Sequence, residues 1–251
     1  PSIQFELDSS TLPHQLVRQS DGSFKYEPVV YNDRTVGDNT TNPIPSFVGK
    51  KISNLFFYRN RLGFLAGDSV VLSKSGDFFN FFETSAIQAT ADDPIDISAS
   101  STRPAVLKYA RSTSAGLVLF GERDQFLLST DGDVLSPTTA KVNTLSSFEC
   151  DAELEAESLG TTIAFIAKTP LFTRVYELGD IDTERSPTMA ENTAIVPEFI
   201  PATVDSFTTS STQSMISLGT KGQNKVFQYR FLTQKDKRVA SWYTWTLTGN
   251  L

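Results

Sequence analysis

Residues 54–77 read NLFFYRNRLGFLAGDSVVLSKSGD, and this stretch decides the fold. An apolar run over 56–65 is followed by a turn at Gly67-Asp68, a second apolar run over 70–73 and a closing turn after Gly76. Phenylalanine and β-branched residues are frequent in strands, and Gly-Asp pairs favour tight turns. The stretch therefore predicts antiparallel strands joined by a short turn.

The same arrangement recurs three more times along the chain. The later apolar runs begin at Leu117, Ile163 and Met215. The marker residues Gly76, Gly132 and Gly179 lie 56 and 47 residues apart. A repeat of roughly 40–50 residues with short strands is typical of β-propeller blades. Because no Trp-Asp or Gly-His pair marks the repeat, a β-sandwich with evenly spaced hairpins stays open as an alternative.

These patterns predict an all-β, propeller-like fold that is built of consecutive antiparallel hairpins and is incomplete as a propeller. Few segments show a sustained period of 3.6 residues, so we expect little helix. Residues 1–50 contain a hairpin turn at Asp21-Gly22 and a polar, proline-containing loop, and we expect them to pack on the propeller. The expected blades cover residues 51–100, 101–150, 151–200 and 201–251.

Composition argues against several functional classes. The 251 residues include 22 basic and 29 acidic side chains, for a net charge of −7, and the basic residues are scattered. Tight binding of nucleic acid phosphates is therefore disfavoured. Cys150 is the single cysteine and His14 the single histidine, which excludes an intramolecular disulfide and a Cys/His zinc site. We expect no metal, no cofactor and no membrane insertion, since no apolar run approaches ~18 residues.

The best candidates for catalysis are three carboxylates, at Asp92, Asp93 and Asp96. A suitably spaced pair of carboxylates hydrolyses glycosides. The sequence Asp-Asp-Pro also makes a stable turn, because aspartate side chains bond local amides, and we favour this interpretation. His14 has no Cys or Ser partner nearby, and no nucleophile motif is present, so we expect no catalytic residue.

Residues 43–82 read PIPSFVGKKISNLFFYRNRLGFLAGDSVVLSKSGDFFNFF, and this stretch closely resembles the tail tubular protein B (nozzle protein) family of podoviruses. Shorter motifs that resemble the same family lie at residues 10–14, 16–18, 21–24, 33–34, 37–38, 41–43, 92–96, 125–126, 147–150 and 242–245. Members of the family are several hundred residues longer. The chain also starts at Pro1 without methionine, and we therefore expect a fragment of a longer protein.

The resemblance implies a structural protein of the virion tail, assembled in the host cytoplasm, and not an enzyme. It implies a subunit of a six-fold homo-oligomeric ring that contacts the tail adaptor protein and the tail fibres. The ring would line the exit channel, and genomic DNA would pass without tight binding. The alternatives are a carbohydrate-binding or carbohydrate-hydrolysing β-propeller at the host surface, and a host sensor or enzyme propeller with no phage link.

One further stretch, residues 148–158, alternates acidic residues with small or apolar ones. Its carboxylates belong to Glu149, Asp151, Glu153, Glu155 and Glu157. In a strand, a period of two places all five on one face. We predict a strand with a solvated acidic face. This face is either an ordinary solvent-exposed surface or, if the ring is formed, part of the wall of its central channel, where it would repel the phosphates of DNA.

Overall fold

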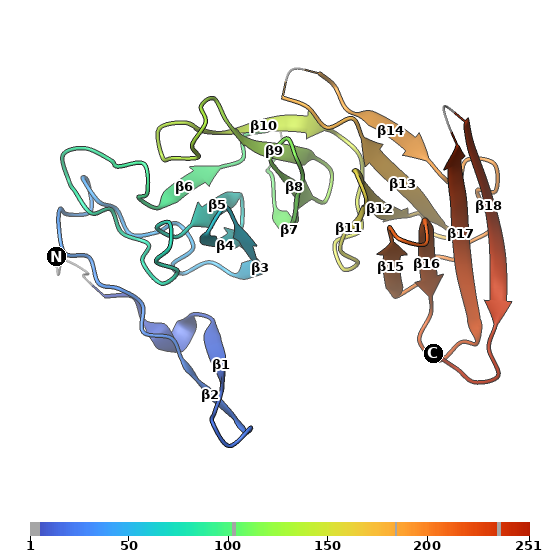
Figure 1. Cartoon of the computed structure of the whole chain (residues 1–251), viewed down its shortest axis with the longest axis horizontal. Helices are drawn as coiled ribbons and strands as arrows, with labels where there is room; N and C mark the ends of the chain where they lie inside the picture. The colour runs from blue at the N-terminus through green and yellow to red at the C-terminus, as the bar shows by residue number, and fades with distance from the viewer. Residues whose placement is uncertain (1–5, 102–103, 184, 235–236) are drawn as a thin grey trace. The chain divides into compact units, whose positions relative to one another are not determined.

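The computed structural model describes residues 6–101, 104–183, 185–234 and 237–251 (Figure 1). Apart from one 3-10 turn, η1 (Ser9–Thr11), its regular elements are strands. These strands form a two-stranded hairpin and four four-stranded sheets, and no described residue lies in an α-helix. The predicted all-β fold of consecutive antiparallel hairpins is therefore confirmed.

The hairpin consists of β1 (His14–Arg18) and β2 (Phe24–Pro28), which pair antiparallel. The Asp21 carboxylate accepts hydrogen bonds from the backbone and side chain of Ser23 at 2.9 and 2.6 Å. Gly22 has a φ of 86°, a conformation that glycine adopts without strain. The turn predicted at Asp21-Gly22 is confirmed.

Each sheet has four strands that follow one another in sequence. The first contains β3 (Ile52–Tyr58), β4 (Arg61–Ala66), β5 (Ser69–Leu72) and β6 (Ile95–Ser98). The second contains β7 (Leu107–Ser112), β8 (Leu117–Gly121), β9 (Gln125–Thr130) and β10 (Ala140–Ser146). The third contains β11 (Glu157–Leu159), β12 (Thr162–Lys168), β13 (Thr173–Gly179) and β14 (Thr188–Glu191). The fourth contains β15 (Ser206–Ser210), β16 (Met215–Gly219), β17 (Lys225–Gln234) and β18 (Lys237–Thr246).

One strand boundary differs from the sequence prediction. The apolar run over 56–65 is not one strand, because it turns back on itself between β3 and β4. Arg59 and Asn60 make this turn with φ values of 46° and 60°. Positive φ at both central residues is the property of a type I′ turn, whose twist matches that of the strands it joins. The first sheet therefore gains its additional strand without a glycine in the turn.

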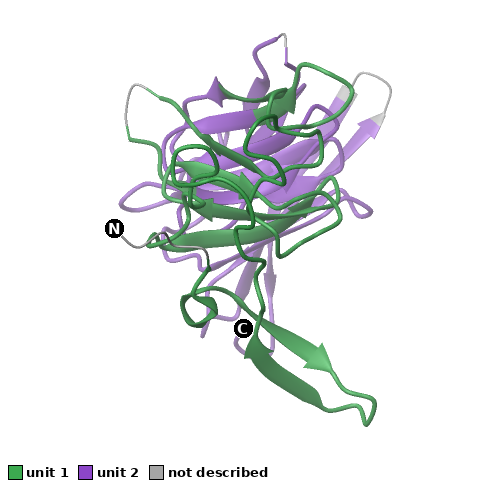
Figure 2. Ribbon diagram, turned by 90° about the vertical axis from the view of Figure 1, so that its left-hand side faces the viewer, with its two compact units in different colours: residues 1–107, 128–143 green, residues 108–127, 144–251 purple. Residues whose placement is uncertain are grey.

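The chain divides into two compact units, residues 1–107 with 128–143 and residues 108–127 with 144–251 (Figure 2). In the first unit, the segment before β3 packs against one face of the first sheet. Phe47 and Phe64 are fully buried and meet edge to face, with ring centroids 5.1 Å apart. Phe81 lies 5.0 Å from Phe47 and 5.1 Å from Phe64. This aromatic trio is the centre of the first unit's core.

In the second unit, successive sheets stack face to face. One cluster joins the second sheet to the third and contains Tyr109, Val118, Phe120, Leu127, Ile163, Phe165 and Leu178. Another joins the third sheet to the fourth and contains Ala164, Ile166, Val175, Ile216, Leu218, Phe227 and Tyr229. Neighbouring residues of β12 alternate between the two clusters, as period-two side chains must. Stacked four-stranded antiparallel sheets are the propeller-like feature of the fold.

Candidate functional site

The acidic stretch does not form the predicted strand. Residues 147–156 have no strand structure, and Glu157 alone of the five acidic residues lies in one, at the start of β11. The Asp151 carboxylate accepts hydrogen bonds from the amides of Glu153 and Leu154, both at 2.8 Å. Such local side-chain bonds compete with extended structure. The prediction of a strand with five carboxylates on one face is therefore wrong.

Cationic side chains from neighbouring strands neutralise part of this acidic segment. Arg111 of β7 lies 2.7 Å from the Glu155 carboxylate and 3.5 Å from that of Glu157. Lys168 of β12 lies 3.2 Å from the Asp151 carboxylate, which is almost buried. The exposed side chains of Glu149 and Glu153 have no ion pair with the described residues. The segment therefore presents a small negative patch and not a continuous acidic wall.

Within the acidic segment, the Cys150 thiol is buried beside Tyr109. The Tyr109 hydroxyl lies 2.7 Å from Cys150 Sγ and donates to the Asp151 carbonyl oxygen at 2.5 Å. Burial raises the pKa of the Cys150 thiol to about 12, and burial with the adjacent thiol raises the pKa of Tyr109 above its ordinary value. Because a thiolate is the nucleophilic form, this cysteine is a structural one.

The three aspartates that were weighed for catalysis are held in structural contacts. Asp93 is fully buried, and its carboxylate accepts hydrogen bonds from the amides of Thr84 and Thr90 and from the Thr84 hydroxyl. Burial opposes its ionisation, but these hydrogen bonds prevail and lower its pKa. Asp92 forms an ion pair with Lys74 at 3.3 Å, in a turn before β6. The predicted turn at Asp-Asp-Pro is confirmed.

The third of these aspartates, Asp96 of β6, accepts hydrogen bonds from the amide and the hydroxyl of Ser46. It joins the segment before β3 to the edge of the first sheet. His14 is equally occupied: its ring stacks on Tyr26, with centroids 5.1 Å apart, and its Nδ1 donates to the Leu12 carbonyl at 2.9 Å. Neither side chain is free to exchange a proton with a substrate. Within the described part of the chain, neither is set opposite a second acid or base, as acid–base catalysis requires.

A buried cation fixes the aspartate turn, and the sequence analysis missed it. Arg61 of β4 is 2% exposed. Its guanidinium donates to the carbonyl oxygens of Ser73, Ala91 and Asp93 at 2.8, 2.9 and 2.6 Å. Burial lowers the pKa of Arg61 from its ordinary value, with the charges of the nearby aspartates acting in the opposite direction. The carbonyl cage makes this arginine a structural one.

A buried carboxylate in the third sheet was also missed. Glu177 of β13 is 6% exposed and accepts from both terminal nitrogens of Arg238 on β18, at 3.0 and 2.8 Å. Thr162 and Asn192 donate to the same carboxylate at 2.9 and 3.1 Å. Burial opposes ionisation of Glu177, but the hydrogen bonds, with that from Arg238 the strongest, lower its pKa. The available signal was that Glu177 stands between Tyr176 and Leu178 and shares a strand face with Val175.

The described residues offer no metal centre. No group of three or more His, Cys, Asp or Glu side chains in that part of the chain is placed to hold an ion. Within the same ranges, no helix has the length and apolar character needed to cross a membrane.

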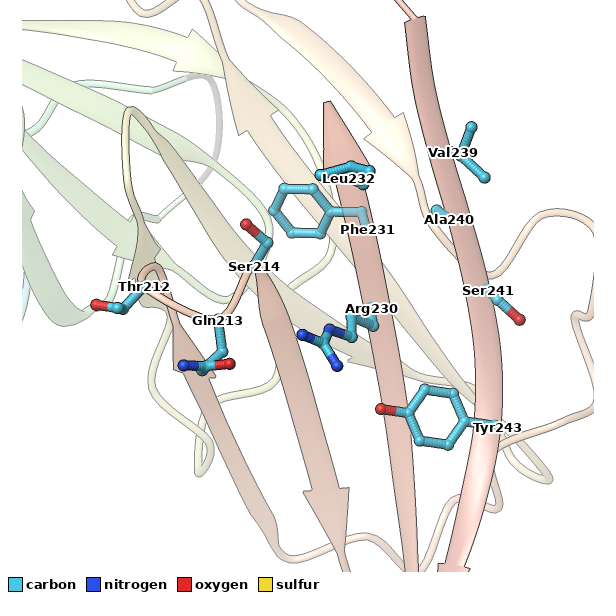
Figure 3. A pocket seen from close by; sticks show the side chains of 10 residues that line it. All are labelled: Thr212, Gln213, Ser214, Arg230, Phe231, Leu232, Val239, Ala240, Ser241 and Tyr243. Carbon is cyan, nitrogen blue, oxygen red and sulfur yellow. The ribbon is translucent and has the colours of Figure 1, made fainter. Parts of the chain in front are cut away.

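The fourth sheet carries an open hollow of about 540 Å³ along β17 and β18 (Figure 3). The turn between β15 and β16 closes one side of it with Thr212, Gln213 and Ser214. On the two strands, the hollow is lined by residues that include Arg230, Leu232, Val239 and Tyr243. Arg230 is the one charged residue among the described residues that line the hollow. The hollow is shallow and mainly apolar, and this form suits contact with another protein surface more than catalysis.

A family model described as bacteriophage nozzle protein matches residues 1–251. The chain belongs to the bacteriophage nozzle protein family. It is 35% identical over 244 residues to the tail tubular protein gp12 of Escherichia phage T7, and the match covers 96% of this chain. The chain spans 31% of the length of that relative. The name of that relative describes it as a tubular protein of a phage tail.

Two solved structures share a weaker likeness with this nozzle family chain, at 11% sequence identity. A complex of S. cerevisiae Dbp5 with Nup159 and Gle1 gives a TM-score of 0.47 and covers 81% of this chain and 47% of that one. The N-terminal domain of Nup159 gives a TM-score of 0.45, with coverage of 81% and 48%. Both scores are below 0.5, and nothing about the nozzle chain is inferred from them.

Proposed function

We propose that this chain is the propeller-like part of a ring subunit that lines the DNA exit channel of a short phage tail and acts without catalysis. The observation that carries the proposal is the family match over the whole chain, with 35% identity to the T7 tail tubular protein. In this proposal the ring is six-fold, and it contacts the tail adaptor protein and the tail fibres. Residues 51–251 supply the blades, and residues 1–50 pack on them.

The state of the polar side chains supports a structural role. Asp93, Arg61 and Glu177 are buried in hydrogen bonds and ion pairs, and Cys150 is held beside Tyr109. A general acid or base must be able to exchange a proton with a substrate, whereas these groups are already engaged in hydrogen bonds and ion pairs. The carbohydrate alternative has no support in the structure or the comparisons, because its candidate aspartates maintain a turn and a strand edge.

Charge supports passage of DNA without adhesion. A net charge of −7 with scattered basic residues provides no phosphate-binding stripe. We extend the proposal to the exposed carboxylates of Glu149 and Glu153, which would turn toward the channel and repel phosphate at short range. Since the other acidic residues of this segment are paired, the repulsion is local.

The test is assembly of the full-length protein followed by electron microscopy. We expect closed rings with six-fold symmetry that bind the adaptor protein from the same phage, and no cleavage of host glycans. Monomers that bind neither adaptor nor fibre would contradict the assembly role. For the two exposed carboxylates, cysteines placed at Glu149 and Glu153 in the ring should cross-link to a DNA strand threaded through it. Labelling of both cysteines from the outside of a DNA-filled ring would reject the channel placement.

A further inference from the structure

The first unit contains a cavity of about 290 Å³, which we name the proline cavity. It is enclosed by the loop before β3, the segment before β6, the strand β6 itself and the loop before β10. Its walls include four prolines and two carboxylates, those of Pro43, Pro45, Pro94, Pro137, Glu83 and Asp96. Proline has a fixed φ and loses almost no side-chain entropy on contact, so these walls are formed before any partner binds.

The described side chains that line the proline cavity accept hydrogen bonds and leave no donor free. Proline has no amide N–H, and the other apolar lining residues have no polar side-chain atom. Asn42 has donors, but both are used, because its Nδ2 donates to the carbonyl oxygens of Val36 and Glu83 at 3.0 Å each. A group that binds here must therefore bring the donors, and charged donors make the strongest bonds to carboxylates.

Glu83 is fixed through its backbone while its carboxylate is left unbound. Its amide donates to Asn42 Oδ1 and its carbonyl accepts from Asn42 Nδ2, both at 3.0 Å. Asn42 is 1% exposed, and Arg34 donates to its carbonyl oxygen at 2.9 Å, so this anchor is part of the core. The Glu83 carboxylate has no hydrogen bond or ion pair with the described residues. Burial and the charge of Asp93 raise its pKa, as expected of a carboxylate without a cationic neighbour.

Asp96 provides the second carboxylate of the proline cavity, and it is also held in place. Each of its two oxygens accepts one hydrogen bond from Ser46, from the amide or from the hydroxyl. A carboxylate has about four acceptor positions, so Asp96 keeps capacity for further donors. Neither Glu83 nor Asp96 forms an ion pair within the described ranges. Two like charges at one cavity repel each other, and a cation from outside the chain would relieve that repulsion.

We propose that the proline cavity receives an arginine side chain of a partner protein. The guanidinium would donate to Glu83 and Asp96, and its methylene groups would pack against the proline rings and Phe81. Arginine fits better than lysine, because a guanidinium is planar, carries five donors and is more weakly hydrated than an ammonium group. The acidic walls supply the charge complementarity, and their rigidity lowers the entropic cost of binding. This inference holds whether or not the protein acts in a tail.

Peptide binding to the full-length protein tests the proposal. The probe is acetyl-Gly-Arg-Gly-amide, and the matched control is the same peptide with citrulline, which resembles arginine in shape but has no charge. Titrations followed by saturation-transfer NMR should show at least about fivefold tighter binding of the arginine peptide. Added salt should weaken this binding, since it depends on charge.

A charge-removing substitution connects the binding to Glu83. Glu83→Gln keeps both backbone bonds to Asn42, and the thermal midpoint checks that the variant is folded. It should weaken binding of the arginine peptide by at least about fivefold, because a charge-assisted contact is lost. Glu149→Gln makes the same change at an exposed carboxylate outside the cavity and should leave the affinity unchanged.

Alkylation gives a second measurement, which locates the peptide. Pro43 is exposed and lines the proline cavity, so the Pro43→Cys variant places a thiol at its opening. Modification of position 43 by iodoacetamide, measured by mass spectrometry, should slow several-fold in saturating arginine peptide. The citrulline peptide at the same concentration should have no effect.

Several results would overturn the proposal. Equal affinity for the arginine and citrulline peptides would reject a cation site, and so would unchanged affinity in the folded Glu83→Gln variant. Unchanged alkylation at position 43 would place the peptide elsewhere. Tighter binding of a lysine peptide would assign the cavity to an ammonium group and reject arginine. None of these results bears on ring formation, which tests the proposed function separately.

Discussion

Glu177 and Arg238 lie 61 residues apart in sequence and join the third sheet to the fourth through two parallel hydrogen bonds. The Arg238 guanidinium also lies 3.9 Å from the centroid of the Phe231 ring. A bidentate arginine–carboxylate pair with cation–π support is among the strongest polar contacts that a protein makes. The long hairpin of β17 and β18 is fixed to its neighbour at this point.

Removing the carboxylate should therefore destabilise the chain. Glu177→Ala leaves Arg238, Thr162 and Asn192 without their acceptor, and we expect the free energy of unfolding to fall by about 2–4 kcal/mol. Urea unfolding followed by circular dichroism measures the change. Glu149→Ala, at an exposed position, should change it by less than about 0.5 kcal/mol. A double-mutant cycle with Arg238→Ala should show a coupling above about 1 kcal/mol, and additive losses would contradict a direct pair.

The same pair predicts a specific pH dependence. The pKa of Glu177 is lower in the folded protein than its ordinary value of 4.5, so the unfolded chain binds its proton first. The stabilising contribution is complete above pH 4.5 and is lost as the pH falls through the lower, folded value. Unfolding free energies measured across this acidic range should decline more steeply for the unaltered chain than for Glu177→Gln. Parallel curves would show that the carboxylate does not contribute through ionisation.

Arg61 offers a second test with a neighbouring control. Arg61→Lys keeps the charge but removes the planar set of donors that serves several carbonyl oxygens, and we expect a loss of about 2–3 kcal/mol. Arg59 is exposed in the turn just before it, so Arg59→Lys should change stability by less than about 0.5 kcal/mol. Thermal unfolding of both variants measures the difference. Similar midpoints for the two would mean that the carbonyl cage contributes little.

Cys150 should be inert toward alkylation while the protein is folded. Its thiol is buried and has a pKa of about 12, so the thiolate fraction at pH 8 is very small. Iodoacetamide should leave the folded chain unmodified, as measured by intact mass, and should alkylate it fully in guanidinium chloride. The variant Tyr109→Phe removes the hydroxyl above the thiol and should increase the alkylation rate through easier local opening. Rapid alkylation of the unaltered folded chain would contradict the burial of Cys150.

Local patterns in the sequence predicted the secondary structure well where turn chemistry was explicit. The hairpin at Asp21-Gly22 and the turn at Asp92-Asp93 follow from residues that bond their own backbone, so nearby sequence suffices to find them. The Arg59-Asn60 turn was missed, because neither residue is glycine and an arginine with positive φ is uncommon.

The long-range contacts were not predictable from local patterns. The acidic segment alternates as a strand does, but its conformation depends on Arg111 and Lys168, which come from other parts of the chain. The burial of Arg61 depends on carbonyl groups about thirty residues away, at Ala91 and Asp93. A single sequence names these residues but does not show that they lie close together in the folded chain.

The stacking of sheets through separate apolar clusters has a consequence for cooperativity. Each cluster in the second unit connects only two neighbouring sheets, so the stability of a sheet is the sum of its own strands and its adjacent interfaces. The third sheet takes part in both clusters, whereas the fourth takes part in one of them. In the isolated chain, amide hydrogens of β16 and β17 should therefore exchange through openings of lower free energy than those of β12 and β13. Local opening of the second unit should therefore start at the fourth sheet, and the cluster between the third and fourth sheets sets how much free energy that opening requires.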